Sequence, residues 1–219
     1  MHKINTNYLK ILLEDGLQQL ELSYTDILLS NILLYVNLII KWNKISNLTS
    51  ILLPEQIIIR HIFDSLSIIR FIIGYDILDF GTGAGLPGIP LSLFLPNYRF
   101  TLIDSSSKKT SFLDHVIFTL KIKNVSVLNE RIEKFSHLKP FNVIVTRATY
   151  SINTAIDKIK HLSSSKQNHG SNITYFLAMK GKKSHLYNEL LSVDKNIYEL
   201  HTIKVPYLNE ERTLVKLLI

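Results

Sequence analysis

The sequence of 219 residues predicts an α/β fold in which a seven-stranded, mostly parallel sheet follows an N-terminal helical extension. Two observations predict it. Apolar runs without hydrophobic–polar alternation, which are typical of buried parallel strands, alternate along the chain with segments of helical periodicity. One such run, residues 77–80, leads directly into a glycine-rich stretch, as strands do where a tight turn connects them to a helix.

The first third of the chain is predicted to be helical. Leucines at helical spacing indicate a helix over residues 8–22, and a Thr-Asp cap precedes a second helix over residues 26–42. A proline suited to the first turn opens a third helix, which is expected over residues 54–73. We therefore expect residues 1–73 to pack as a helical extension on a sheet domain that comprises residues 74–219.

The remainder of the chain is predicted to alternate strands and helices. The last two strands are expected to pair as an antiparallel hairpin, and the polar segment 163–172 is expected to be a mobile loop. The predicted strands are residues 77–80, 99–103, 124–128, 141–146, 173–179, 198–205 and 213–218. The predicted helices of this part are residues 86–95, 105–121, 152–162 and 184–193.

The main candidate for a ligand site follows the first predicted strand. Gly81, Gly83 and Gly85 stand at alternate positions there, and Leu86 opens the next helix. Such glycines let a ligand approach bare backbone, although a plain strand-to-helix turn is the alternative. Asp104 ends the second strand about 20 residues further on, where an acid holds a ribose diol. Together these residues indicate a cofactor that contains a nucleoside.

The choice between two such cofactors depends on Asp79. Residues 83–88 also fit the dinucleotide-binding pattern G-x-G-x-x-G, which would make the protein an NAD-dependent oxidoreductase. A carboxylate two residues before the first glycine would crowd a pyrophosphate, but it would suit the cationic amino group of S-adenosylmethionine. We therefore favour S-adenosylmethionine.

Other polar residues allow a functional and a structural interpretation. Arg147 ends the fourth strand, at the switch point where ligands collect, and packing explains an arginine there poorly. Ile132 and Glu133 follow the third strand, where either an adenine edge or a solvated helix start fits. Arg60 and Asp64 share a helix face, which favours a surface ion pair over a polar cluster facing the cofactor.

The charge of the chain suggests its partner. A formal net charge of +7 and a pI near 9.4 favour a polyanion, with RNA or DNA first. Lys180, Lys182 and Lys183 cluster at the end of the fifth strand and could meet phosphate, although a solvated helix start is the alternative.

The composition also excludes several classes of protein. The chain has no cysteine, which rules out disulfides, thiolate metal sites and cysteine nucleophiles and fits a reducing cytoplasm. We expect no metal site, because no second histidine follows His61 at ligand spacing. We expect no membrane span either, because the longest apolar-rich run, residues 27–40, is interrupted by polar residues and shorter than the roughly 20 residues that cross a bilayer.

Short motifs that are shared with one family occur along nearly the whole chain. They are Trp42-Asn43, Asn47-Leu48-Thr49-Ser50, Arg60-His61-Ile62-Phe63-Asp64-Ser65, residues 79–90, Leu102-Ile103-Asp104-Ser105, Lys108-Lys109, Phe112-Leu113, Arg131-Ile132-Glu133, Thr146-Arg147-Ala148, Lys180-Gly181 and Glu211-Arg212. With these motifs the chain resembles the bacterial small-subunit ribosomal RNA methyltransferase G family, also called glucose-inhibited division protein B. The resemblance implies a Rossmann-like class I S-adenosylmethionine-dependent methyltransferase that acts on N7 of a guanine in 16S ribosomal RNA.

The resemblance also assigns roles to residues. It places Gly81, Leu86, Ile132, Glu133 and Arg147 at the cofactor. Arg147 is also our catalytic candidate, because of its position at the carboxyl end of the fourth strand. Together with the residues argued above, the expected cofactor-binding set is Asp79, Gly81, Gly83, Gly85, Leu86, Asp104, Ile132, Glu133 and Arg147. The expected contacts with RNA are Lys180, Lys182, Lys183 and Arg212.

The expected partner is therefore 16S ribosomal RNA or the small ribosomal subunit, bound by a monomer.

The chain departs from the family at Asn142, where the family has aspartate, at Thr146, where it has serine, and at Thr149-Tyr150. Asn142 lies at the start of its strand, away from the expected site. A noncatalytic RNA-binding module with a retained nucleotide pocket is the alternative, but its motif residues should have decayed.

Overall fold

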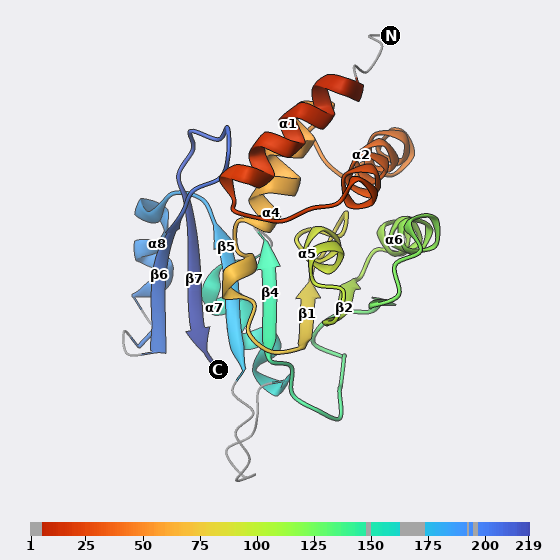
Figure 1. The fold of residues 1–219 in the computed structure, drawn as a ribbon. Coiled ribbons are helices and arrows are strands. Elements are labelled where there is room, and N and C mark those ends of the chain that lie inside the picture. The colour runs from red at the N-terminus through yellow and green to blue at the C-terminus, as the bar shows by residue number, and fades with distance from the viewer. Residues whose placement is uncertain (1–5, 148–149, 163–173, 192, 195–196) are drawn as a thin grey trace.

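The computed structural model describes residues 6–147, 150–162, 174–191, 193–194 and 197–219. The strands are β1 (Asp76–Phe80), β2 (Arg99–Asp104), β3 (Val125–Asn129), β4 (Val143–Arg147), β5 (Tyr175–Lys180), β6 (Tyr198–Ile203) and β7 (Arg212–Leu218). They form one seven-stranded sheet in the order β3-β2-β1-β4-β5-β7-β6 (Figure 1). Strands β1 to β5 pair in parallel, and β7 is antiparallel to β5 and β6. The predicted fold class and terminal hairpin are confirmed, while the loop predicted over residues 163–172 lies outside the described residues.

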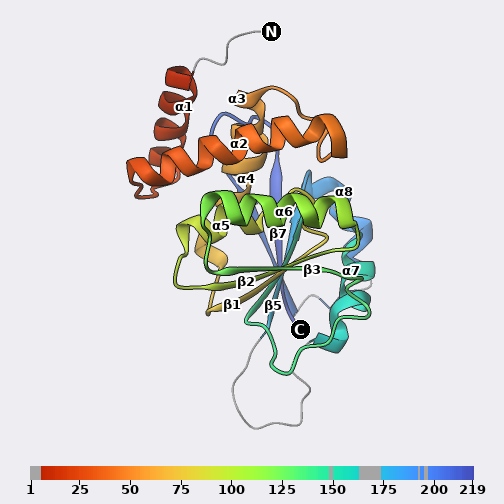
Figure 2. The same ribbon diagram turned by 90° about the vertical axis from the view of Figure 1, so that its right-hand side faces the viewer.

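Helices cover both faces of the sheet (Figure 2). Helices α5 (Gly88–Phe94) and α6 (Ser107–Leu120) pack on one face, and α7 (Ile152–Ile159) and α8 (Lys183–Leu190) pack on the other. Successive residues of a strand point to opposite faces, so Ile77 joins the core under α5 while Leu78 joins the core under α7. Because both faces are buried, the parallel strands read as unbroken apolar runs.

The extension consists of α1 (Thr6–Gln19), α2 (Asp26–Ser46), α3 (Pro54–Ile57) and α4 (Asp64–Leu66). The Thr25 side chain accepts a 3.2 Å hydrogen bond from the backbone N–H of Leu28, which confirms the predicted cap of α2. In Figure 2, α2 lies above α6, and the two helices are in contact. The extension therefore forms a further layer over the face of the sheet that α5 and α6 cover.

The third predicted helix differs from expectation. We expected a continuous helix over residues 54–73, but α3 passes into a π-helical turn over Ile58–Phe63, α4 ends at Leu66, and a 3₁₀ turn follows over Ile69–Phe71. A π turn holds an extra residue and shifts the phase of the side chains that follow. Periodicity had no means of showing this shift, because the segment is apolar on nearly every side.

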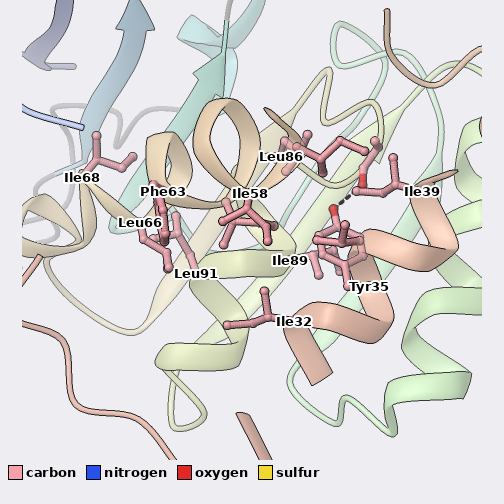
Figure 3. Close-up of a cluster of buried hydrophobic side chains, with 14 of the residues drawn as sticks. Ile32, Tyr35, Ile39, Ile58, Phe63, Leu66, Ile68, Leu86, Ile89 and Leu91 are labelled. Atoms are coloured by element: carbon pink, nitrogen blue, oxygen red, sulfur yellow. Dashed lines mark hydrogen bonds between the residues drawn. The ribbon is translucent and has the colours of Figure 1, made fainter. Parts of the chain in front are cut away.

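The extension and the sheet domain share one hydrophobic core. Figure 3 shows side chains from α2, the π turn and α5 in a single buried cluster that includes Tyr35, Ile58 and Ile89. Contact between α1 and the π turn is so close that a Cβ on Gly16 would lie 2.0 Å from the ring of Phe63. Burying a side chain such as that of Phe63 contributes about 1.5–3 kcal/mol, so this shared core is a substantial part of the folding free energy.

Candidate functional site

The glycine loop, residues 81–87, connects β1 to α5 at the carboxyl end of the sheet. Gly81, Gly83 and Gly85 have φ angles of +65°, +62° and +89°, which a residue with a side chain adopts only under strain. At Gly85 there is also no room, because a Cβ would lie 2.5 Å from Ile89 and 3.2 Å from the Tyr35 hydroxyl. The glycines are therefore required by the shape of this loop.

Asp79 holds the loop from below. Its Oδ2 accepts hydrogen bonds from the Thr82 hydroxyl (2.7 Å) and from the backbone N–H of Gly88 (2.8 Å). The side chain is fully buried, and burial raises its pKa to about 6 against the opposing effect of these two bonds. Its Oδ1 has no hydrogen-bond partner among the described residues. Asp79 is thus a buried support of the loop and takes the N–H group of Gly88 at the start of α5, and it does not line a cavity where it could meet the amino group of a cofactor, as we had expected.

Asp104 ties the tip of β2 to the same loop. One carboxylate oxygen accepts from the backbone N–H of Gly83 and the other from that of Ser106, both at 2.9 Å. Lys109 lies 3.7 Å from the carboxylate. The carboxylate is buried but lines a cavity, so its remaining lone pairs face a space where hydroxyl groups can reach them.

We call this candidate site the cofactor cavity; it has a volume of about 430 Å³ and lies at the carboxyl ends of the first three strands. It brings together four residues that the sequence predicted for the cofactor, namely Gly81, Asp104, Ile132 and Glu133. The rest of its lining is Phe80, Ile103, Ser105, Lys109, Glu130, Arg131, Tyr150 and Lys158.

One wall of the cavity was not predicted from the sequence. Tyr150 stacks on Phe80 with 6.1 Å between the ring centroids, and the Lys158 ammonium lies 4.8 Å from the centre of the Tyr150 ring. Lys158 also forms an ion pair with Glu133. A lysine on a solvated helix carries no sequence signal of such a role.

The other predicted cofactor residues do not line the cavity. Asp79, Gly85 and Leu86 are buried and support the loop, and the N–H group of Gly83 is bonded to Asp104. Arg147 lies at the end of β4, on the same face of the sheet as Asp79, and its charge acts to lower the pKa of Asp79.

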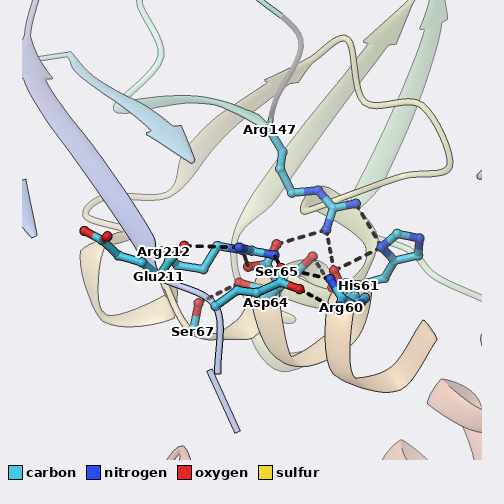
Figure 4. A network of polar contacts seen from close by, with 9 residues as sticks. Arg60, His61, Asp64, Ser65, Ser67, Arg147, Glu211 and Arg212 are labelled. Atoms are coloured by element: carbon cyan, nitrogen blue, oxygen red, sulfur yellow. Dashed lines mark hydrogen bonds and ion pairs between the residues drawn. The ribbon is translucent and has the colours of Figure 1, made fainter. Parts of the chain in front are cut away.

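Arg147 enters a network that we call the arginine cluster: Arg60, His61, Asp64, Arg147, Glu210 and Arg212. Figure 4 shows its guanidinium pointing toward Asp64 and His61. One terminal nitrogen donates to Asp64 Oδ2 and to the Arg60 carbonyl oxygen, both at 3.1 Å, and the other lies 3.3 Å from His61 Nδ1. Arg212 donates from Nε to Asp64 Oδ1, also at 3.1 Å.

The expected surface ion pair between Arg60 and Asp64 is therefore wrong. The residues do form a polar cluster, but none of them lines the cavity, so the structure does not show the cluster facing the cofactor. Asp64 is only 4% exposed and binds the two arginines that approach from β4 and β7. Arg60 instead forms a two-point pair with Glu210, with nitrogen–oxygen distances of 2.9 and 2.6 Å. Helical spacing shows which residues share a face, but not which strands reach that face.

His61 is buried beside this cluster. Its Nε2 lies 2.8 Å from the Thr49 hydroxyl, and burial together with the nearby Arg147 lowers its pKa to about 4. The imidazole is therefore neutral at pH 7 and can face a guanidinium without repulsion.

The residues predicted to contact RNA fall into two groups. Lys180 donates to the Tyr150 carbonyl oxygen at 2.6 Å and to Glu189 at 2.9 Å, and Arg212 is bonded within the arginine cluster. Lys182 and Lys183 are exposed beyond the end of β5. In this geometry the second pair is the better placed for phosphate.

A structural comparison identifies the class of fold. A SAM-dependent methyltransferase from Aquifex aeolicus matches 82% of this chain and 97% of its own, with a TM-score of 0.56 and 16% identity. TrmK of M. capricolum in complex with S-adenosyl-homocysteine matches 71% of this chain and 67% of its own, with a TM-score of 0.51 and 14% identity. At such low identity these likenesses show the fold alone: a Rossmann-like class I S-adenosylmethionine-dependent methyltransferase fold.

Sequence comparison is more specific. The model of the family rRNA small subunit methyltransferase G matches residues 28–215. Ribosomal RNA small subunit methyltransferase G of Ectopseudomonas mendocina is 37% identical over 91% of both chains. The protein of the same name from Colwellia psychrerythraea is 38% identical over 84% of this chain and 85% of its own. The chain belongs to the rRNA small subunit methyltransferase G family, as its motifs implied.

No helix in the described part of the chain is long and apolar enough to cross a membrane. Among the described residues, no group of three or more histidine, aspartate or glutamate side chains could hold a metal ion.

Proposed function

We propose that the protein transfers the methyl group of S-adenosylmethionine to N7 of a guanine in 16S ribosomal RNA. The observation that carries the proposal is the cofactor cavity, where Gly81, Asp104, Ile132 and Glu133 meet in a member of this family. The cavity fits the cofactor chemically, because it offers a buried carboxylate for hydroxyl groups and an apolar side chain beside it.

The bound cofactor would supply a methyl group on a positively charged sulfur. Guanine N7 carries a free lone pair and needs no base to remove a proton before it attacks. The task of the protein is then to align the two reactants and to exclude water. This fits a site that is built from a shaped loop and one guanidinium.

We assign roles by position. Asp104 would accept hydrogen bonds from the ribose hydroxyls, and Ile132 and Glu133 would border the adenine. The backbone at Gly81 would lie against the amino-acid part of the cofactor, while Asp79 maintains the loop. Arg147 would orient the cofactor or the guanine at the end of β4.

The exposed Lys182 and Lys183 would contact phosphate, in keeping with the net charge of +7. The substrate class implies a role in the cytoplasm, and we propose that a monomer binds either free RNA or the assembled small subunit.

The proposal is tested with S-adenosylmethionine that carries a labelled methyl group. The protein is incubated with unmodified 16S RNA and, separately, with small subunits that lack the modification, and the RNA is digested and examined by mass spectrometry. We expect label in 7-methylguanosine on one of the two substrates. Binding of RNA without transfer to either would overturn the proposal in favour of a noncatalytic module. Calorimetric binding of NAD in place of S-adenosylmethionine would favour the oxidoreductase.

A further inference from the structure

We propose that Asp64 is a positioning residue for Arg147, and that it holds this guanidinium at the carboxyl end of β4 in the orientation that methyl transfer requires. The inference rests on the proposed function and extends it to a residue outside the sheet domain. Asp64 lies in the extension, at the start of α4, and is not part of the cofactor cavity.

The Asp64 carboxylate is shared between two arginines. Its two oxygens bind arginines from two strands, Oδ2 to Arg147 of β4 and Oδ1 to Arg212 of β7, and β5 lies between these strands in the sheet. A carboxylate held from both sides has little freedom to rotate. Arg147 is thereby bonded to a group that is itself fixed (Figure 4).

The Arg147 guanidinium is oriented by contacts with three groups. Its plane is defined by the Asp64 carboxylate, the Arg60 carbonyl oxygen and His61 Nδ1, which face two different nitrogens. All three contacts involve the charged guanidinium, but of the three only the contact with Asp64 is an ion pair between opposite full charges. Among them Asp64 therefore attracts the guanidinium most strongly, and we take it as the contact that holds Arg147 in position.

The free energy of burial gives little reason for the Asp64–Arg147 ion pair. An ion pair that is buried loses hydration, and replacing it with apolar side chains is often neutral or stabilising. Asp64 and Arg147 have side-chain exposures of only 6% and 17%, so stability alone is a weak reason for this pair. The pair lies at the switch point of the sheet, close enough to Asp79 for the charge of Arg147 to act on it. Orientation at the site is the stronger reason.

The experiment compares Asp64→Asn, Asp64→Glu, Arg147→Lys and the double variant Asp64→Asn/Arg147→Lys. An asparagine has one oxygen and an NH₂ group, so it can serve only one arginine and turns a donor toward the other. Asp76→Asn is the matched control, because Asp76 also binds an arginine, Arg99, but at the amino end of β1. Each variant is measured for affinity for S-adenosylhomocysteine, RNA affinity, single-turnover methyl transfer and thermal unfolding.

We expect Asp64→Asn to slow single-turnover transfer by about tenfold or more, with RNA affinity unchanged. We expect Asp64→Glu to recover part of the rate, because it retains the charge, and Asp76→Asn to match the wild type. In the double variant the losses in rate and in S-adenosylhomocysteine affinity should not exceed those of Arg147→Lys alone, since residues that act as one unit are not additive.

Losses that multiply in the double variant overturn the inference, because Asp64 would then act independently of Arg147. Wild-type affinity and rate in Asp64→Asn overturn it as well. If Asp64→Asn does not fold, the same cycle is built on Asp64→Glu. If the wild type transfers no methyl group, the proposed function fails, and the calorimetric cycle with S-adenosylhomocysteine still decides whether Asp64 acts through Arg147.

Discussion

The hydroxyl of Tyr35, in the second helix of the extension, donates a 2.5 Å hydrogen bond to the carbonyl oxygen of Ala84 in the glycine loop. Tyr35 is fully buried, and burial raises the pKa of its phenol, so the hydroxyl is present as a donor throughout the physiological range. The glycine loop is thus held by the Asp79 carboxylate of β1 and by the Tyr35 hydroxyl of the extension.

Tyr35→Phe tests this link. The substitution leaves the Ala84 carbonyl buried without its donor, and we expect a loss of about 1–3 kcal/mol in the free energy of unfolding. Urea titration followed by circular dichroism measures it, and affinity for S-adenosylhomocysteine should fall as well. Tyr75→Phe, at a tyrosine that is 60% exposed, is the control. Equal stability of the two variants would show that the bond is not a constraint on the loop.

Asp104→Ala tests the ribose contact. It should weaken S-adenosylhomocysteine binding by roughly 1.5–3 kcal/mol, because charged hydrogen bonds to the hydroxyls are lost. Calorimetry is the measurement, with Asp114→Ala on the exposed side of α6 as the control. An unchanged dissociation constant in a folded Asp104→Ala protein would remove Asp104 from the cofactor site.

Arg147→Lys separates an enzyme from a binding module. Lysine retains the charge but cannot reach three acceptors with one planar group. We expect single-turnover transfer to fall about tenfold to a thousandfold, or roughly 1.4–4 kcal/mol of barrier, with little change in RNA affinity. Arg99→Lys, at an exposed pair at the amino end of the parallel strands, should leave the transfer rate unchanged. If Arg147→Lys is silent too, Arg147 contributes only charge.

We expect Asp79→Asn to change the pH dependence of the free energy of unfolding. The folded-state pKa of Asp79 is raised, to about 6, so the folded protein binds more protons than the unfolded chain between about pH 4 and 6. Its contribution to stability therefore falls as pH rises through that window. His61, whose folded-state pKa is lowered to about 4, acts in the opposite direction over nearly the same window, so the two contributions partly offset each other in the wild type.

The informative quantity is consequently a difference. The stability of Asp79→Asn minus that of the wild type should increase from pH 4 to pH 6 by up to about 3 kcal/mol and then level off. Chemical denaturation at several pH values measures it. A difference that does not vary with pH would mean that Asp79 titrates normally in the folded protein.

If the lysines beyond β5 contact phosphate, RNA affinity should depend on the salt concentration through them. Each phosphate contact releases counterions, so Lys182→Ala/Lys183→Ala should weaken RNA binding and reduce the slope of log affinity against log salt by about one per lysine. Filter binding at several salt concentrations gives the slope. Lys123→Ala/Lys139→Ala removes two exposed lysines at the other end of the sheet and is the charge-matched control. The same slope in both double variants would place the RNA elsewhere.

Local patterns predicted the features that depend on neighbours along the chain. The apolar runs marked the strands, and the glycines with Asp104 marked the cavity, because a tight turn and a strand tip are encoded within a few residues. The partners of Asp64 and Arg60 were not predictable in this way, since Arg212 and Glu210 are 148 and 150 residues away from them. The bond between Tyr35 and the glycine loop was not predictable for another reason. A tyrosine on the apolar stripe of a helix has the same sequence pattern as any core residue.

The long sequence separation between Asp64 and Arg212 has a consequence for the protein during its synthesis on the ribosome. Asp64 is synthesised 148 residues before Arg212, and until then its carboxylate lacks at least one of the two guanidinium groups that hold it. Domains generally fold from the N-terminus during synthesis, but here a contact of α4 is completed only by β7. A nascent chain that already carries the glycine loop and Arg147 is therefore not yet able to hold Arg147 in its final position. Methyl transfer should begin only after β7 has left the exit tunnel and entered the sheet.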